Sequence, residues 1–181
     1  MNESWTTNCH SGPSCIKATF QATTDNWAAV YWQNPENNWG TQPNAGYDLS
    51  GATKLTFWAR GETGHEYLEF FVGGISGTYP DSLPKTSTGF IRLSSAWQKY
   101  SINLTSRNIS YVIGGFGFAL NAPGNPGGAT FYLDDIQFDK IRPADLRLLV
   151  SYQTLSSTAE PDKIITNTCF IYDNALALLA Y

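Results

Sequence analysis

The chain has 181 residues, of which 14% are charged and 14% are aromatic, and its formal net charge is -4. This length suits one domain with a sizeable core, and the low charge content, against roughly 25% in an average soluble domain, predicts a polar but weakly charged surface. A negative chain without a basic stripe argues against binding to a nucleic-acid backbone. No run approaches the ~18 apolar residues of a membrane span, so we expect no membrane partner.

Two cysteines near the N-terminus enclose a short, turn-rich loop. Cys9 and Cys15 flank HSGPS, whose glycine and proline can bring the thiols together, so we predict a disulfide and an oxidising compartment. A metal site is the weaker alternative, because His10 alone supplies too few further ligands. No signal-peptide pattern is present, and we expect a secreted protein whose leader is missing from this chain. We interpret Cys169 as a buried free thiol.

Short runs of β-branched and aromatic residues alternate with Gly-, Asn-, Pro- and Ser-rich clusters up to about residue 140. This pattern is typical of an all-β sandwich or barrel, and eight strands suit a jelly roll. The predicted strands cover residues 15–21, 27–33, 54–61, 66–73, 89–93, 98–103, 112–120 and 129–138. Turn-rich stretches at 34–50 and 121–128 lie between them.

After residue 140 the hydrophobic period changes from two toward 3.6. Pro143 can open one helix, and Asp173 can cap a second, apolar one that runs to Tyr181. We therefore predict a β-sandwich over residues 1–139 and, over residues 140–181, a linker and the truncated start of a following helical domain.

Strand alternation divides the aromatic residues into core-facing and outward-facing sets. The predicted core sets are Ala28, Val30 and Trp32, then Leu55, Phe57 and Ala59, then Leu68, Phe70 and Val72. The outward sets of the same three strands combine rings with hydrogen-bonding groups, and Trp39 follows in an Asn-rich loop. A sugar has an apolar C–H face that stacks on aromatic rings, and a rim of hydroxyls that amides, carboxylates and guanidinium groups bind.

These outward groups predict a carbohydrate-binding surface. The proposed stacking platforms are Trp27, Tyr31, Trp58 and Phe71, with Trp39 at the rim and Gln33, Arg60 and Glu69 as hydrogen-bonding groups. The alternative is that loops or a neighbouring domain cover the rings.

Three segments together resemble a known family. GYDLSGATKLTFWARG at 46–61, LSSAWQKYSINLT at 93–105 and TFYLDDIQF at 130–138 are similar, in this order, to the jelly-roll carbohydrate-binding modules of the galactose-binding-like class. The resemblance covers roughly residues 5–139 and implies a non-catalytic module attached to a polysaccharide-degrading enzyme, often with one structural calcium ion. It implies Asp134 as a calcium ligand, with Glu3 as a candidate partner. The alternative is that Asp134 hydrogen-bonds loop amides.

No catalytic residue is predicted. Adjacent strand residues face opposite ways, so Asp134 and Asp135 should not flank one glycosidic bond, and no nucleophile, zinc or phosphate-loop motif is present. The leading hypothesis is a monomeric module that binds a polysaccharide or oligosaccharide and targets an attached C-terminal catalytic domain. The alternatives are a structural sandwich that packs its aromatic face against a following domain, and the N-terminal fragment of a glycoside hydrolase with a helical catalytic domain.

Overall fold

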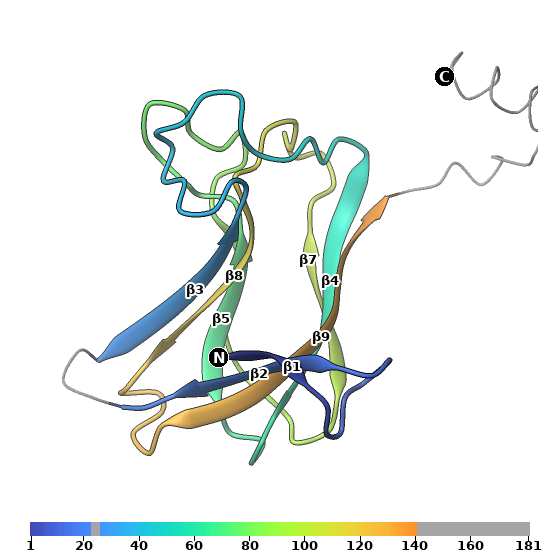
Figure 1. Ribbon diagram of the computed structural model, residues 1–181, viewed down its shortest axis with the longest axis vertical. Helices are drawn as coiled ribbons and strands as arrows, with labels where there is room; N and C mark the ends of the chain where they lie inside the picture. The colour runs from blue at the N-terminus through green and yellow to red at the C-terminus, as the bar shows by residue number, and fades with distance from the viewer. Residues whose placement is uncertain (23–25, 141–181) are drawn as a thin grey trace, which may run out of the picture. The chain divides into compact units, whose positions relative to one another are not determined.

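Two antiparallel sheets face each other in the computed structural model, which describes residues 1–22 and 26–140 (Figure 1). The five-stranded sheet has the order β1-β2-β9-β4-β7 and the four-stranded sheet the order β3-β8-β5-β6. The strands are β1 (Asn2–Trp5), β2 (Cys15–Phe20), β3 (Trp27–Gln33), β4 (Ala52–Gly61), β5 (Tyr67–Val72), β6 (Thr86–Arg92), β7 (Gln98–Asn103), β8 (Gly114–Asn121) and β9 (Ala129–Lys140). The predicted all-β jelly-roll sandwich is confirmed.

All eight predicted strands are present, and β1 is the strand that the sequence did not reveal. Its residues, NESW, are polar and mostly exposed, and in the described ranges it pairs with β2 alone. A four-residue polar edge strand lacks the alternation on which strand prediction depends. The predicted linker, helices and free Cys169 lie outside the described residues. Within the described ranges, no helix is long and apolar enough to cross a membrane.

The core lies between the sheets and is rich in phenylalanine. Phe57 of β4 and Phe70 of β5 are fully buried, with ring centroids 4.6 Å apart, and they join the two sheets. Phe118 and Phe131 make a second contact between the sheets, at 4.9 Å. Trp32 packs against this core, as alternation predicted. Inward-facing residues of both sheets therefore fill the space between them.

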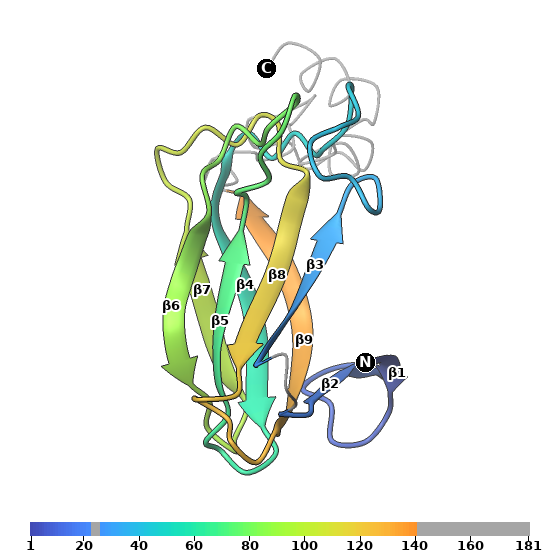
Figure 2. The same ribbon diagram turned by 90° about the vertical axis from the view of Figure 1, so that its left-hand side faces the viewer.

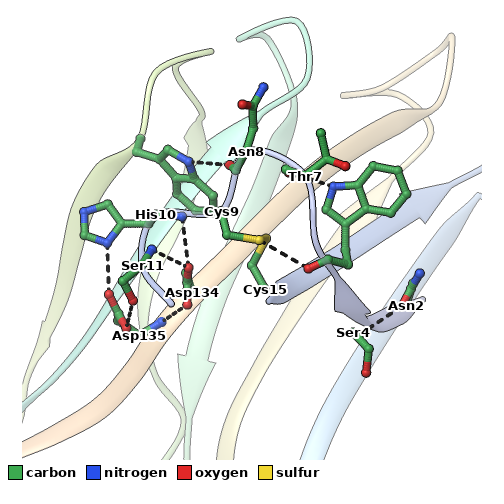
Figure 3. The surroundings of a disulfide bond; sticks show 12 residues. Asn2, Ser4, Thr7, Asn8, Cys9, His10, Ser11, Cys15, Asp134 and Asp135 are labelled. Atoms are coloured by element: carbon green, nitrogen blue, oxygen red, sulfur yellow. Dashed lines mark hydrogen bonds and ion pairs between the residues drawn. A yellow bond between two sulfur atoms is a disulfide. The ribbon is translucent and has the colours of Figure 1, made fainter. Parts of the chain in front are cut away.

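A β-bulge in β9 changes the direction of one side chain. β4 pairs Thr56 with Gln137 and then Trp58 with Asp134, so β9 has one residue more than β4 between these pairs. Asp135, within the bulge, has a φ of 48°, in the left-handed region. Because a bulge interrupts alternation, Asp134 and Asp135 both reach the same loop on the outer side of the sheet (Figure 3). The prediction that they face opposite ways was wrong.

The predicted disulfide joins Cys9 and Cys15, whose Cα atoms are 5.4 Å apart (Figure 3). The enclosed loop covers part of the outer side of the five-stranded sheet. The backbone N–H groups of His10 and Ser11 donate to one oxygen of Asp134, each at 3.0 Å. The Ser11 hydroxyl and the His10 ring hold the pKa of Asp135 below its usual value. The disulfide therefore closes a loop that is anchored on β9.

Replacing both Cys9 and Cys15 with serine should lower the free energy of unfolding by about 2 kcal/mol, because a short loop is no longer closed in the unfolded chain. Urea denaturation followed by tryptophan fluorescence measures this change. A reducing agent should destabilise the wild-type protein by a similar amount and leave the double variant unchanged. An unfolding midpoint of the wild type that does not respond to reduction would contradict the prediction.

Candidate functional site

The strands β3, β8, β5 and β6 form one sheet, which faces the viewer in Figure 2. Its outer side carries side chains whose sequence neighbours face the core. The pairing register aligns them in three rows across the strands β3, β8, β5 and β6. The rows are Trp27, Asn121, Tyr67 and Arg92; Ala29, Ala119, Glu69 and Phe90; and Tyr31, Gly117, Phe71 and Ser87. We call these residues, together with Trp39 from the loop after β3, the aromatic face.

Three rings of the aromatic face are open to solvent. Trp27 is 66% exposed, Trp39 56% and Phe90 41%. The Phe90 ring stacks on Tyr67 with centroids 5.1 Å apart, and the Arg92 guanidinium lies 5.0 Å from the centre of the Tyr67 ring. Exposed apolar surface on one face of a protein often marks a binding site when it is contiguous.

Small residues separate the exposed rings. Ala29 and Ala119 pair across β3 and β8, and Gly117 follows on the same side of β8. A Cβ atom at Gly117 would lie 2.5 Å from the Phe71 ring, so a larger residue does not fit there without displacing that ring. Small residues therefore occupy β3 and β8 at the centre of the face, and the Phe71 ring covers Gly117.

A buried asparagine holds the loop that presents Trp39. Asn38 is fully buried, and its Oδ1 atom accepts the backbone N–H groups of Gly40, Thr41 and Gln42 at 3.1 to 3.3 Å. Gly40 has a φ of 77° and packs against the carbonyl group of Ser76, so only glycine fits this turn. Since Asn38 points inward, its neighbour Trp39 points outward, where its ring meets the edge of Tyr31 at 6.1 Å.

Tyr31 and Phe71 belong to the aromatic face but are held in place by tertiary contacts. The Tyr31 hydroxyl donates to the carbonyl oxygen of Gly73, and burial, together with nearby Asp81, raises the pKa of this phenol. Phe71 is only 4% exposed, because the Tyr31 ring lies 4.9 Å away and the Lys85 ammonium lies 4.7 Å from the ring centre. The prediction that Phe71 is an open stacking platform was wrong: its outward position is covered.

The polar groups of this region are largely engaged. Glu69 accepts a 2.6 Å hydrogen bond from Lys85, and their side chains are 12% and 50% exposed. The Nε2 atom of Gln33 is buried and has no hydrogen-bond partner within the described ranges. The exposed part of the Glu69–Lys85 ion pair can offer both a donor and an acceptor to a hydroxyl group.

The structure separates Trp58 and Arg60 from the other predicted residues. Both lie on β4, which belongs to the five-stranded sheet, so they face away from the aromatic face. The His10 ring stacks on Trp58 at 3.7 Å, and Arg60 lies over Tyr132. The expectation of one surface shared by three strands was wrong, because alternation tells which side of its own sheet a residue takes but not to which sheet the strand belongs.

Asp134 accepts hydrogen bonds from loop amides, which was the alternative to its role as a calcium ligand. One of its oxygens accepts the His10 and Ser11 amides and the other accepts the amide of Asp135 at 2.8 Å. Within residues 1–22 and 26–140, no three His, Cys, Asp or Glu side chains gather as metal ligands. Calcium needs six to eight oxygen ligands. The arrangement around Asp134 therefore does not fit the ion that the resemblance implies.

The aromatic face also contains Tyr67, Phe90 and Arg92, which were not among the predicted site residues, and Lys85 lies beside it. Phe90 and Arg92 alternate with Ile91, which packs against the core. This alternation within TSTGFIR was available in the sequence, but one ring in a polar strand is a weak signal. Lys85 lies outside any strand, and its contact with Glu69 depends on the tertiary fold.

The fold is similar to a family 30 carbohydrate-binding module of a cellulosomal cellulase of Clostridium thermocellum, with 16% identity, 76% of this chain and 80% of that chain covered, and a TM-score of 0.51. Another family 30 carbohydrate-binding module matches with 18% identity over 77% of this chain and 76% of that one, at a TM-score of 0.49. No protein-family model and no curated protein matches the chain. At these identities the similarity concerns the fold, and it agrees with the predicted jelly-roll class of carbohydrate-binding modules.

Proposed function

We propose that this chain is a non-catalytic carbohydrate-binding module that binds a neutral polysaccharide on its aromatic face. The observation that carries the proposal is the exposure of Trp27 and Trp39 on one side of one sheet, at the two ends of β3. Tyr31, beside which Trp39 stands, is four positions after Trp27 along β3, and this corresponds to roughly 13 Å. Such a span is longer than one sugar ring and suits an oligosaccharide.

The chemistry of the face supports a neutral ligand. Exposed indole and phenyl rings can stack on the C–H faces of sugars, and the small side chains of Ala29 and Ala119 lie between Trp27 and Tyr31 in the register of β3 and β8. The Glu69–Lys85 pair offers hydrogen bonds to hydroxyl groups without adding net charge. Because few charges take part, binding should depend only weakly on salt.

The carboxylates of Glu69, Asp134 and Asp135 support a binding role over a hydrolytic one. Glycosidases need two carboxylates placed on either side of one glycosidic bond. Asp134 and Asp135 are both held by the disulfide loop, and Glu69 is paired with Lys85. We propose that catalysis belongs to an attached polysaccharide-degrading domain, which this module directs to its substrate. The disulfide supports a secreted protein, since such bonds persist in oxidising compartments.

Affinity electrophoresis of the whole chain through gels that contain different neutral polysaccharides tests the proposal. At least one polysaccharide should retard the protein, and isothermal titration calorimetry with its oligosaccharides should give the same Kd at 50 and 500 mM salt, within about twofold. A panel of cellulose derivatives, mixed-linkage glucans, xylans, mannans and galactans without any retardation would refute it.

A further inference from the structure

Arg60 lies on the outer side of the five-stranded sheet, remote from the aromatic face. Tyr132 of β9 pairs with Lys17 of β2 on one side and with Arg60 of β4 on the other. The Arg60 guanidinium lies 4.0 Å from the centre of the Tyr132 ring and 5.6 Å from that of Trp97. Its planar faces are thus held by aromatic rings, which fixes the orientation of its N–H edges.

The Arg60 guanidinium lacks the partners that such a group normally has. It makes one long hydrogen bond, from Nη1 to the carbonyl oxygen of Gly61 at 3.4 Å, and its Nε atom is buried with no partner in the described part of the chain. No carboxylate of residues 1–22 or 26–140 comes within 4.0 Å of it, and Glu62 instead accepts the hydroxyl of Tyr132. A partly buried cation without a counter-charge is costly and usually has a partner.

A pocket of about 260 Å³ opens beside this cation. We call it the Arg60 pocket; it is lined by Asn8, Cys9, Arg60, Ser95, Ala96 and Trp97. Its wall is fixed, because the Trp97 indole donates to the Asn8 carbonyl oxygen at 3.0 Å and Cys9 belongs to the disulfide (Figure 3). The Arg60 pocket therefore combines a guanidinium group whose Nη2 atom has no hydrogen-bond partner in the described residues, an indole, and the small polar groups of Asn8 and Ser95.

We propose that the Arg60 pocket is a second binding site, which takes the carboxylate of an acidic sugar such as a uronic acid residue. Because Nε is buried, Arg60 binds the carboxylate through the N–H groups of Nη1 and Nη2, and Asn8 and Ser95 meet the hydroxyls of the same sugar. Lys17, on the opposite side of Tyr132, lies over the Trp5 ring at 4.1 Å and does not line the Arg60 pocket. This site lies on a different sheet from the aromatic face, so neither needs the other.

Titration of the ¹⁵N-labelled chain with sodium glucuronate tests the second site by NMR spectroscopy. The amide signals of Asn8, Ser95 and Ala96 should shift to saturation with glucuronate and stay unchanged with glucose. Arg60→Gln should raise the Kd for glucuronate at least tenfold, since a charge-assisted bidentate pair is lost. Arg107→Gln, which removes an exposed arginine of the β7–β8 loop, should leave the Kd unchanged.

Arg60→Lys tests the role of the planar guanidinium group, and acetate tests whether the sugar ring contributes to binding. Arg60→Lys keeps the charge but loses the planar fork, so its Kd should also rise; if Arg60→Gln does not fold, this variant decides. Unchanged affinity in Arg60→Lys, no saturable shift with glucuronate, or acetate binding as tightly as glucuronate would each overturn the assignment. Trp27→Ala should not alter glucuronate binding, so failure here is distinguishable from failure of the aromatic face.

Discussion

Replacing Trp27 with alanine should raise the Kd for the bound polysaccharide about 30-fold and leave the protein folded. The ring is 66% exposed, so its removal takes little packing from the free protein. In the complex, the same removal costs the apolar contact and the ring stacking, together about 2 kcal/mol, which corresponds to about 30-fold in Kd. Calorimetry with an oligosaccharide chosen from the gel experiment measures the change, and urea denaturation monitors the fold.

Trp39→Ala offers a second measurement at the other end of β3. It should weaken binding by a similar factor, because Trp39 is 56% exposed and stands on a loop held by Asn38. Trp58→Phe is the matched control: it keeps a ring against His10 on the other sheet, and binding should remain at the wild-type level. Full affinity in both Trp27→Ala and Trp39→Ala would exclude the aromatic face as the site.

The local part of this site could be predicted from the sequence. Alternation alone placed Trp32 in the core and Trp27 and Tyr31 on the outer side of the same strand, and the structure agrees. This works because the two-residue period of a strand is a property of its backbone. The disulfide was equally local, since Cys9 and Cys15 are separated by a loop too short to keep them apart.

The parts that depend on topology could not be predicted in this way. Trp58 has the same outward pattern as Phe71, yet β4 and β5 belong to different sheets, and their connection crosses from one sheet to the other. Asp135 shows a second limit: one extra residue in β9 reverses the expected direction of a side chain. The exposure of a side chain is a third limit, since Phe71 points outward but is covered by Tyr31 and Lys85. Each is set by contacts between segments distant in sequence.

Replacing Glu66 with alanine should lower the free energy of unfolding by about 3 kcal/mol, the largest stability effect that we expect for a single substitution of a charged residue. The side chain is only 5% exposed. Its carboxylate accepts the backbone N–H groups of Thr63, Gly64 and His65 at 2.8 to 3.0 Å, and also the Thr63 hydroxyl. Alanine leaves these four donors without an acceptor at the turn that leads into β5. Urea denaturation at neutral pH measures the loss, and an unchanged midpoint would contradict this role.

The same carboxylate should make stability depend on acid. Burial raises the pKa of Glu66, but the hydrogen bonds from Thr63 and its neighbours outweigh it, so the net pKa lies below the ordinary value of 4.5. A lowered pKa in the folded state stabilises the protein above the unfolded pKa, and this contribution is lost as the pH falls through the folded value. Glu66→Gln should therefore be less stable than wild type at pH 7 and lose less stability between pH 7 and pH 3. Glu36→Gln, which removes an exposed carboxylate, is the matched control and should follow the wild-type acid profile. Parallel acid profiles for Glu66→Gln and the wild type would show that the carboxylate does not carry this charge-dependent stabilisation.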